Sequence, residues 1–118
     1  MTPWDHAISS AVHFGGDASD YILVHDWLDS TKQYTGNWTH RMFRHHSAGV
    51  QWAIELFGHT VQNSVGEHVP TKKIAEQHII EDCGFIPTPA DWAKCVGNNP
   101  EDWMLRVKKK NVQNMELV

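Results

Sequence analysis

Residues 37–58, NWTHRMFRHHSAGVQWAIELFG, form the stretch around which the rest of the chain is organised. At about 100° per residue, its large apolar side chains fall on one side of a single long helix. The adjacent histidines His45 and His46 lie within that apolar side, whereas His40 and Arg44 fall on the opposite side. A buried imidazole without a partner is costly. We therefore expect a metal, a carboxylate, a phosphate or a backbone carbonyl beside this histidine pair.

The periodicity of the remaining sequence predicts an all-α fold, a compact bundle of about five to six helices. The other predicted helices run from residue 3 to 14, from about 20 to 34, from 71 to 83, and in two short segments that begin after Thr88 and Asn99. Residues 59–70 contain β-branched residues around a turn, which predicts a short β-hairpin or ordered loop between the third and fourth helices. We expect a single His-rich domain over residues 1–110. A C-terminal tail, 111–118, either frays or pairs with another subunit.

In the first helix, the predicted buried stripe consists of Trp4, Ala7, Ile8, Ala11 and Val12. His6 and His13 fall on the opposite face. We therefore expect both imidazoles to be exposed, like that of His40.

Composition limits the classes of function. Nine His and six Trp in 118 residues suggest a pocket with stacking surfaces and titratable or metal-binding groups. The formal net charge of −4 argues against binding to duplex nucleic acid, which requires a basic surface. The sequence has neither an apolar run near the roughly 18 residues of a membrane span nor a signal-peptide core, so we expect a cytoplasmic protein, in a bacterial cell or an infected host. Cys83 and Cys95 are predicted to be reduced core residues.

Polar residues also interrupt the apolar side of the helix over 71–83, where His78 and Asp82 lie four residues apart. In a small bundle the inward faces meet, so the predicted reactive or metal centre consists of His45, His46, His78 and Asp82. His25 and Asp29, at the edge of the second helix, can join it. Three histidines and one aspartate suit Zn, Mn or Fe with an open position for water. Alternatively, Asp82 orients His78 without contacting a metal.

Two kinds of chemistry follow from such a centre. A metal-bound water is acidic enough to attack a phosphoryl or carbonyl group, whereas a metal-free histidine pair can act as acid and base on a phosphodiester. The predicted substrate-binding residues are Trp38, Arg41, Trp52 and His25, because the two tryptophans flank the histidine pair and an arginine can hold a phosphate.

Three motifs carry a resemblance to a known family: His25-Asp26-Trp27; His40-Arg41 with His45-His46 and Gly49; and Glu76-Gln77-His78 with Asp82 and Gly84. Over residues 4–95 the chain resembles a family of small bacterial and phage proteins known as a domain of unknown function. This resemblance implies a helical domain with a His-rich site and no established reaction. The His25-Asp26 dipeptide also resembles the signature of HD-type metal-dependent phosphohydrolases. In those enzymes both residues face the metal, whereas the helical periodicity here places Asp26 away from the core.

The leading hypothesis is a phosphodiesterase or phosphohydrolase that acts on a cyclic or modified nucleotide signal, as phage proteins that counter host defence do. A small-molecule nucleotide is the expected partner, in a monomer or a homo-oligomer. One alternative is a non-catalytic protein that sequesters such a nucleotide. A second alternative is a structural metal-binding domain.

Overall fold

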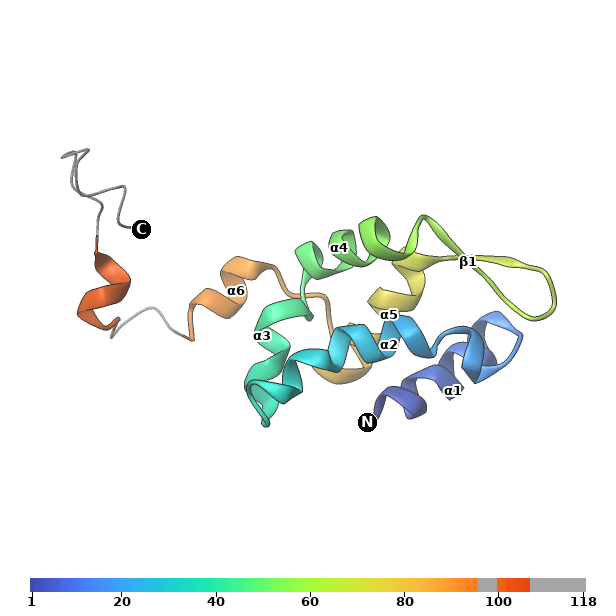
Figure 1. The fold of residues 1–118 in the computed structure, drawn as a ribbon, viewed down its shortest axis with the longest axis horizontal. Helices are drawn as coiled ribbons and strands as arrows, with labels where there is room; N and C mark the ends of the chain where they lie inside the picture. Colours follow the sequence, from blue (N-terminus) through green and yellow to red (C-terminus); the bar gives the residue numbers. More distant parts are fainter. Residues whose placement is uncertain (96–99, 107–118) are drawn as a thin grey trace.

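The computed structural model describes residues 1–95 and 100–106. In that part of the chain there are six α-helices and one antiparallel hairpin (Figure 1). The helices are α1 (Pro3–Phe14), α2 (Ile22–Asp29), α3 (Arg41–Arg44), α4 (Ser47–Phe57), α5 (Thr71–Cys83) and α6 (Pro89–Ala93). Four 3-10 turns, η1 (Ala18–Asp20), η2 (Ser30–Gln33), η3 (Trp38–His40) and η4 (Asp102–Leu105), and the strands β1 (Thr60–Gln62) and β2 (His68–Pro70) complete the fold. The prediction of an all-α bundle with a hairpin is confirmed.

Local sequence signals set several helix ends. Thr2 and Asp5 form a reciprocal capping box at the start of α1, and Thr88 and Asp91 form the same arrangement at the start of α6. Gly84 ends α5 in the left-handed conformation that glycine adopts without strain. The second predicted helix is shorter than expected, because α2 ends at Asp29 and the chain continues as the turn η2.

The predicted continuous helix over 37–58 is wrong, because the chain turns a corner at His45 and His46. The backbone of His46 is extended, and its Nδ1 accepts a hydrogen bond from the Gly49 N–H, so this imidazole caps α4. The corner is tight: a Cβ at position 49 would overlap the carbonyl oxygen of Arg44. Glycine therefore permits the chain to turn here, and the turn separates the short α3 from α4.

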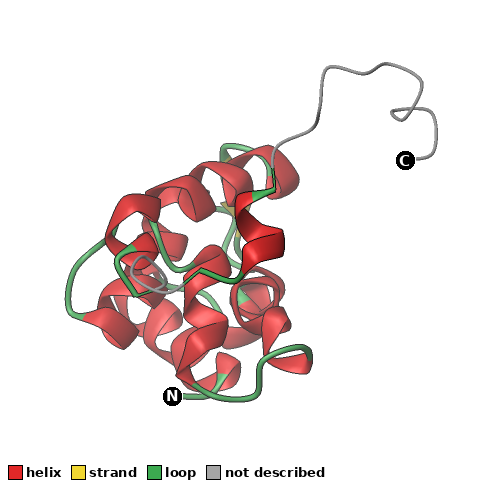
Figure 2. Cartoon of the chain, turned by 90° about the vertical axis from the view of Figure 1, so that its left-hand side faces the viewer, coloured by secondary structure: helices red, strands yellow, loops and turns green. Residues whose placement is uncertain are grey.

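Most of the buried residues form two groups with different chemistry. The apolar core consists of Tyr21, Val24, Leu28, Val50, Ala53, Val69, Ile74, Ala75 and Ile79. The polar core consists of His6, Ser10, His25, Asp29, His40, His45 and His78, together with the buried side chain of Asp82. Helices α2 and α5 contribute to both groups and contact each other, so one pair of helices carries both cores. Figure 2, turned by 90° from Figure 1, shows the helices packed against one another and joined by loops.

Helix α1 buries a face that differs in part from the predicted one: Ala7 and Ala11 of the predicted stripe do pack inside, but Trp4, Ile8 and Val12 do not. His6, Ala7 and Ser10 are buried, whereas Trp4 and Val12 are 49% and 79% exposed. The small side chains of Ala7 and Ser10 allow α1 to approach α2 and α5 closely, and His6 and Ser10 find hydrogen-bond partners there. Polar contacts therefore decide which face of α1 is buried. His13 is exposed, as predicted.

The hairpin connects α4 to α5. Its register pairs Thr60 with Pro70 and Val61 with Val69, and the side chain of Val69 enters the apolar core. Two strands alone are marginally stable, so this packing against the helices supports the ribbon. No helix in residues 1–95 or 100–106 has the length and apolar character needed to cross a bilayer. The predicted tail, 111–118, lies outside the described residues.

Candidate metal centre

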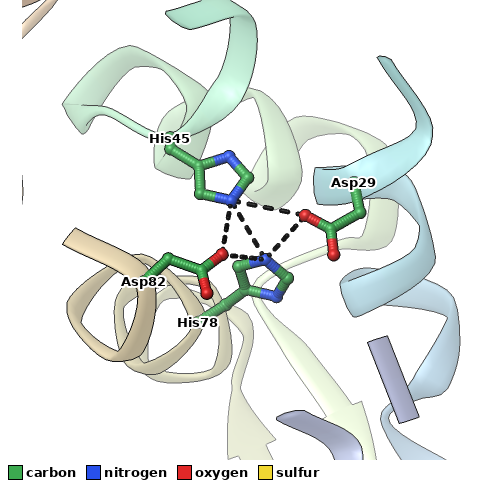
Figure 3. A group of neighbouring side chains, drawn as sticks. All are labelled: Asp29, His45, His78 and Asp82. Atoms are coloured by element: carbon green, nitrogen blue, oxygen red, sulfur yellow. Dashed lines mark hydrogen bonds and ion pairs between the residues drawn. The ribbon is translucent and has the colours of Figure 1, made fainter. Parts of the chain in front are cut away.

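Four side chains from two helices and one corner of the chain direct potential metal-ligand atoms toward a common point (Figure 3). The atoms are Asp29 Oδ1, His45 Nε2, His78 Nε2 and Asp82 Oδ2, which all lie within 4.8 Å of one another. His78 Nε2 lies 3.1 Å from Asp29 Oδ1 and 3.1 Å from His45 Nε2. His45 Nε2 lies 3.0 Å from Asp82 Oδ2. Three of the four residues were predicted for the centre, and Asp29 was predicted at its edge.

The local structure explains how these residues meet. His78 and Asp82 are one turn apart on α5, so their side chains share a face. Asp29 is the last residue of α2. His45 lies at the corner between α3 and α4, where its backbone leaves the helical conformation. The break in the predicted helix is therefore what directs His45 toward α2 and α5.

A chain of hydrogen bonds behind His78 fixes where its proton lies. The Gln77 amide nitrogen donates to the carbonyl oxygen of His6, so its oxygen faces Ser10 and accepts the hydroxyl proton at 2.5 Å. Ser10 Oγ then accepts from His25 Nε2–H at 2.7 Å. Burial lowers the pKa of His25 to about 3, so this imidazole is neutral. Its Nδ1 therefore accepts from His78 Nδ1–H at 2.9 Å, so Nε2 is the nitrogen that His78 directs toward the centre and offers to a ligand.

The centre therefore places two carboxylates close to two imidazoles. Burial raises the pKa of Asp29 and of Asp82, but contacts with the imidazoles of His45 and His78 outweigh it, and both pKa values are lowered. Both carboxyl groups are therefore ionised. Burial lowers the pKa of His45, yet its hydrogen bonds to Asp29 and Asp82 raise the pKa overall. Positive charge is favoured at this point, and either a proton on an imidazole or a bound cation supplies it.

His6 supports the centre from behind Asp82. Its Nδ1 lies 2.8 Å from Glu81 Oε1, its Nε2 lies 3.2 Å from Asp82 Oδ1, and its ring stacks on His78 at 3.7 Å between centroids. Burial lowers the pKa of His6, but the contacts with Asp82 and Glu81 outweigh it and raise the pKa. The expectation that His6 is exposed is therefore wrong, because two carboxylates hold it in the interior.

His40 is a further residue that the sequence reasoning placed in solvent. It is 4% exposed, its Nδ1–H donates to the Asn37 carbonyl at 2.7 Å, and its Nε2 lies 3.4 Å from Asp29 Oδ1. That nitrogen has no hydrogen-bond partner among the described residues. The prediction failed because it assumed one helix over 37–58, whereas His40 lies in η3, before the corner.

His46 and three of the predicted substrate-binding residues contribute no atom to the group of four ligand atoms. His46 is buried, but its ring nitrogens bond the Phe43 carbonyl and the Gly49 N–H, so Asp29 replaces it in the predicted ligand set. Trp52 packs edge-on against His46, away from the four ligand atoms. His25 is fully buried behind His78, where it orients that ring and does not face a ligand. Trp38 stacks on Trp92.

A pocket of about 360 Å³ lies beside the centre. Its lining includes Arg41, Asp82, Phe85, Pro87 and Trp92. Cys83 and Cys95 line it as well. Cys83 is half-buried and Cys95 is exposed, so the prediction that both are core residues is wrong for Cys95. Asp82 belongs both to the pocket and to the four-residue centre, which connects the two.

The fold and the centre define a helical protein with a buried group of histidines and aspartates that could hold a metal ion. A family model described as a domain of unknown function, DUF6915, matches residues 1–104. The chain belongs to this family, in agreement with the predicted membership of an uncharacterised family. No curated protein and no solved structure matches the chain.

Proposed function

We propose that this protein is a metal-dependent hydrolase of phosphoesters, with Asp29, His45, His78 and Asp82 as the metal ligands. The observation that carries the proposal is the convergence of four potential ligand atoms within 4.8 Å in the interior of the bundle. Nitrogen and oxygen donors without a thiolate suit Zn, Mn or Fe. Two carboxylates and two neutral imidazoles would balance a divalent charge.

The surrounding residues support a working centre. His25 holds the proton of His78 away from the centre, and His6 orients Asp82. Such outer contacts fix the orientation of metal ligands and strengthen them as donors. A divalent ion held by these four residues would supply an acidic bound water and a Lewis acid for a phosphoryl oxygen.

The pocket beside Asp82 provides the reason for choosing a phosphoester. It contains an arginine and two aromatic rings next to the centre, which suits an anionic group attached to a planar ring. A cyclic or modified nucleotide is therefore the substrate class that we propose. That this nucleotide is a signalling molecule, and that the protein counters a host defence for a phage, are predictions from the sequence alone.

One observation favours a second candidate, a structural metal site. The imidazoles of His45 and His78 are completely buried, as ligands of a closed structural site are. In that case the metal supports folding, and its removal unfolds the domain.

Metal analysis followed by a hydrolysis assay tests these candidates. The purified protein is analysed for Zn, Mn and Fe, then incubated with bis(4-nitrophenyl) phosphate and a panel of cyclic nucleotides before and after chelation. We expect one metal per chain, hydrolysis that chelation abolishes, and helicity that chelation largely preserves. His78→Gln removes one of the four proposed ligands, so it is expected to lose most of the bound metal and of the hydrolysis together.

His13→Gln, an exposed histidine on α1, serves as the matched control and is expected to retain full activity. Helicity that disappears with the metal, without any hydrolysis, would establish the structural site instead. Nucleotide that binds and is recovered intact would favour sequestration. A protein that takes up no metal would contradict both metal proposals.

A further inference from the structure

We propose that the pocket lined by Arg41, Phe85 and Trp92, here called the Arg41 pocket, binds an organic phosphate of the size of one nucleotide. The anionic group lies at Arg41, and the planar ring lies against the aromatic side chains. This inference rests on the proposed function and names the substrate class of the same centre. It also narrows the expected substrate from nucleotides in general to a single nucleotide unit.

Arg41 has unused hydrogen-bonding capacity inside the protein. Its Nη1 donates to the main-chain oxygen of Asp82 at 3.4 Å, a long bond, and its buried Nε has no partner among the described residues. No carboxylate in residues 1–95 or 100–106 lies within ion-pair distance of it. A guanidinium presents five N–H donors in a planar fork that matches a phosphate or carboxylate. An anion in the pocket would satisfy the donors that the protein leaves free.

Arg44, one turn later, shows what a structural arginine looks like in the same segment. Its Nη1 donates to the Trp27 carbonyl and to Ser30 Oγ, and its guanidinium lies 4.3 Å from the centroid of the Trp27 ring. Arg44 is therefore committed to packing against α2. The contrast indicates that Arg41 is the arginine available to a ligand.

The position of the Arg41 pocket brings a bound anion next to the metal ligands. Arg41 bonds the backbone of Asp82, and Asp82 lines the pocket while its side chain points into the centre. The carboxylate of Asp91, which also lines the pocket, is engaged with the Thr88 backbone and with Lys94 at 3.6 Å. Its charge is therefore compensated, and with a divalent ion at the centre the pocket would favour a phosphate group.

The aromatic side chains and the volume limit the rest of the ligand. The Trp92 Nε1–H donates to the carbonyl oxygen of His45 at 2.8 Å and its ring stacks on Trp38, so the indole is held in place. Phe85 is 57% exposed and lines the same pocket. Aromatic rings of this kind stack with nucleobases. The volume of about 360 Å³ lies near the lower end of the roughly 300–1,000 Å³ of small-molecule sites, which fits one nucleotide better than a linked pair.

Calorimetry on the metal-loaded protein tests the proposal without requiring turnover. The probes are AMP, inorganic phosphate, adenosine and the linear dinucleotide pApA. AMP is expected to bind more tightly than phosphate or adenosine alone, and more tightly than pApA. Arg41→Gln should weaken AMP about tenfold to a hundredfold, the usual effect of losing charged hydrogen bonds, and should leave adenosine unchanged. Arg41→Lys should recover part of the loss.

Two further variants keep the test independent of folding effects at position 41. Phe85→Ala, at an exposed side chain, should weaken AMP severalfold and leave inorganic phosphate unchanged. Lys72→Gln removes one positive charge from an exposed position on α5 that does not line the pocket, and it should change AMP affinity by no more than about twofold. AMP affinity equal in Arg41→Gln and wild type, or pApA binding as tightly as AMP, would overturn the proposal.

The two proposals fail separately. If the protein hydrolyses phosphoesters but Arg41→Gln and Phe85→Ala bind AMP normally, the hydrolase proposal is kept and the proposed ligand site at the Arg41 pocket is rejected. If AMP binding depends on Arg41 and Phe85 but the protein hydrolyses nothing, the ligand site is kept and the hydrolase proposal is rejected.

Discussion

The apolar core and the polar core share the helices α2 and α5, but their buried groups are stabilised differently. On α5, Ile74 and Ile79 pack among other hydrocarbons, whereas His78 and Asp82 lie among charges and hydrogen bonds. Hydrocarbon burial stabilises a fold without any further partner. The polar core instead depends on the number of protons or cations it holds, because four acceptor atoms meet there. The difference indicates that the apolar core determines whether the bundle folds, whereas the polar core is adapted to hold a cation.

The largest expected effect is a loss of unfolding free energy when the apolar core is damaged and the polar core is left intact. Ile74→Ala removes a completely buried side chain and leaves a cavity, and such changes cost about 2–5 kcal/mol. Urea denaturation in the presence of chelator should show this loss, while the folded variant at low temperature should bind the same amount of metal as wild type. A variant that folds but has lost its metal would show that the two cores are not separable.

A smaller effect is expected from the polar core of the metal-free protein. The pKa of folded His6 is raised, so His6 contributes stability that is fully present below its unfolded pKa of about 6.5 and is lost as the pH rises through its folded pKa. Each unit by which the pKa is raised adds about 1.4 kcal/mol. The difference in unfolding free energy between wild type and His6→Gln should therefore be larger at pH 5.5 than at pH 9.

The control for this prediction is His13→Gln on the same helix, where the imidazole is exposed. Its difference from wild type should be small at both pH values. A His6→Gln difference that grows with pH would mean that His6 is not the cation that holds Asp82 and Glu81.

The smallest expected effect tests whether His46 caps a helix or binds a metal. His46→Ala removes the hydrogen bond to the Gly49 N–H at the start of α4, and losing such a cap costs about 1 kcal/mol. His46→Asn, which restores a capping side chain, should recover most of that stability. Both variants should keep the full metal content, measured by elemental analysis. Loss of metal in both would return His46 to the ligand set.

Much of the fold could be predicted from the sequence, because apolar periodicity and capping residues act locally. Thr2 with Asp5 and Thr88 with Asp91 begin helices where their spacing indicates, and Gly84 ends one. The pairing of His78 with Asp82 in an inward stripe could also be found, since four residues separate them on one helix.

The rest of the centre could not be predicted, because helical periodicity assigns polar residues to the solvent side. That assumption fails where a polar core exists, so His6 and His40 were placed on the wrong side and Asp29 only at the edge. A usable signal was present in α1, where the small residues Ala7 and Ser10 share a face with His6 and permit close packing. For His40 the sequence offers no such signal, because its direction depends on the corner that follows α3.

That corner also gives a way to recognise other chains that carry the same centre. Any side chain at position 49 would collide with the Arg44 carbonyl, so the corner that directs His45 inward requires glycine three residues after His46. The spacing His-His-x-x-Gly is therefore a filter for family members. A member that keeps both histidines but carries a larger residue in place of this glycine is expected to continue the helix, and its equivalent of His45 would leave the centre.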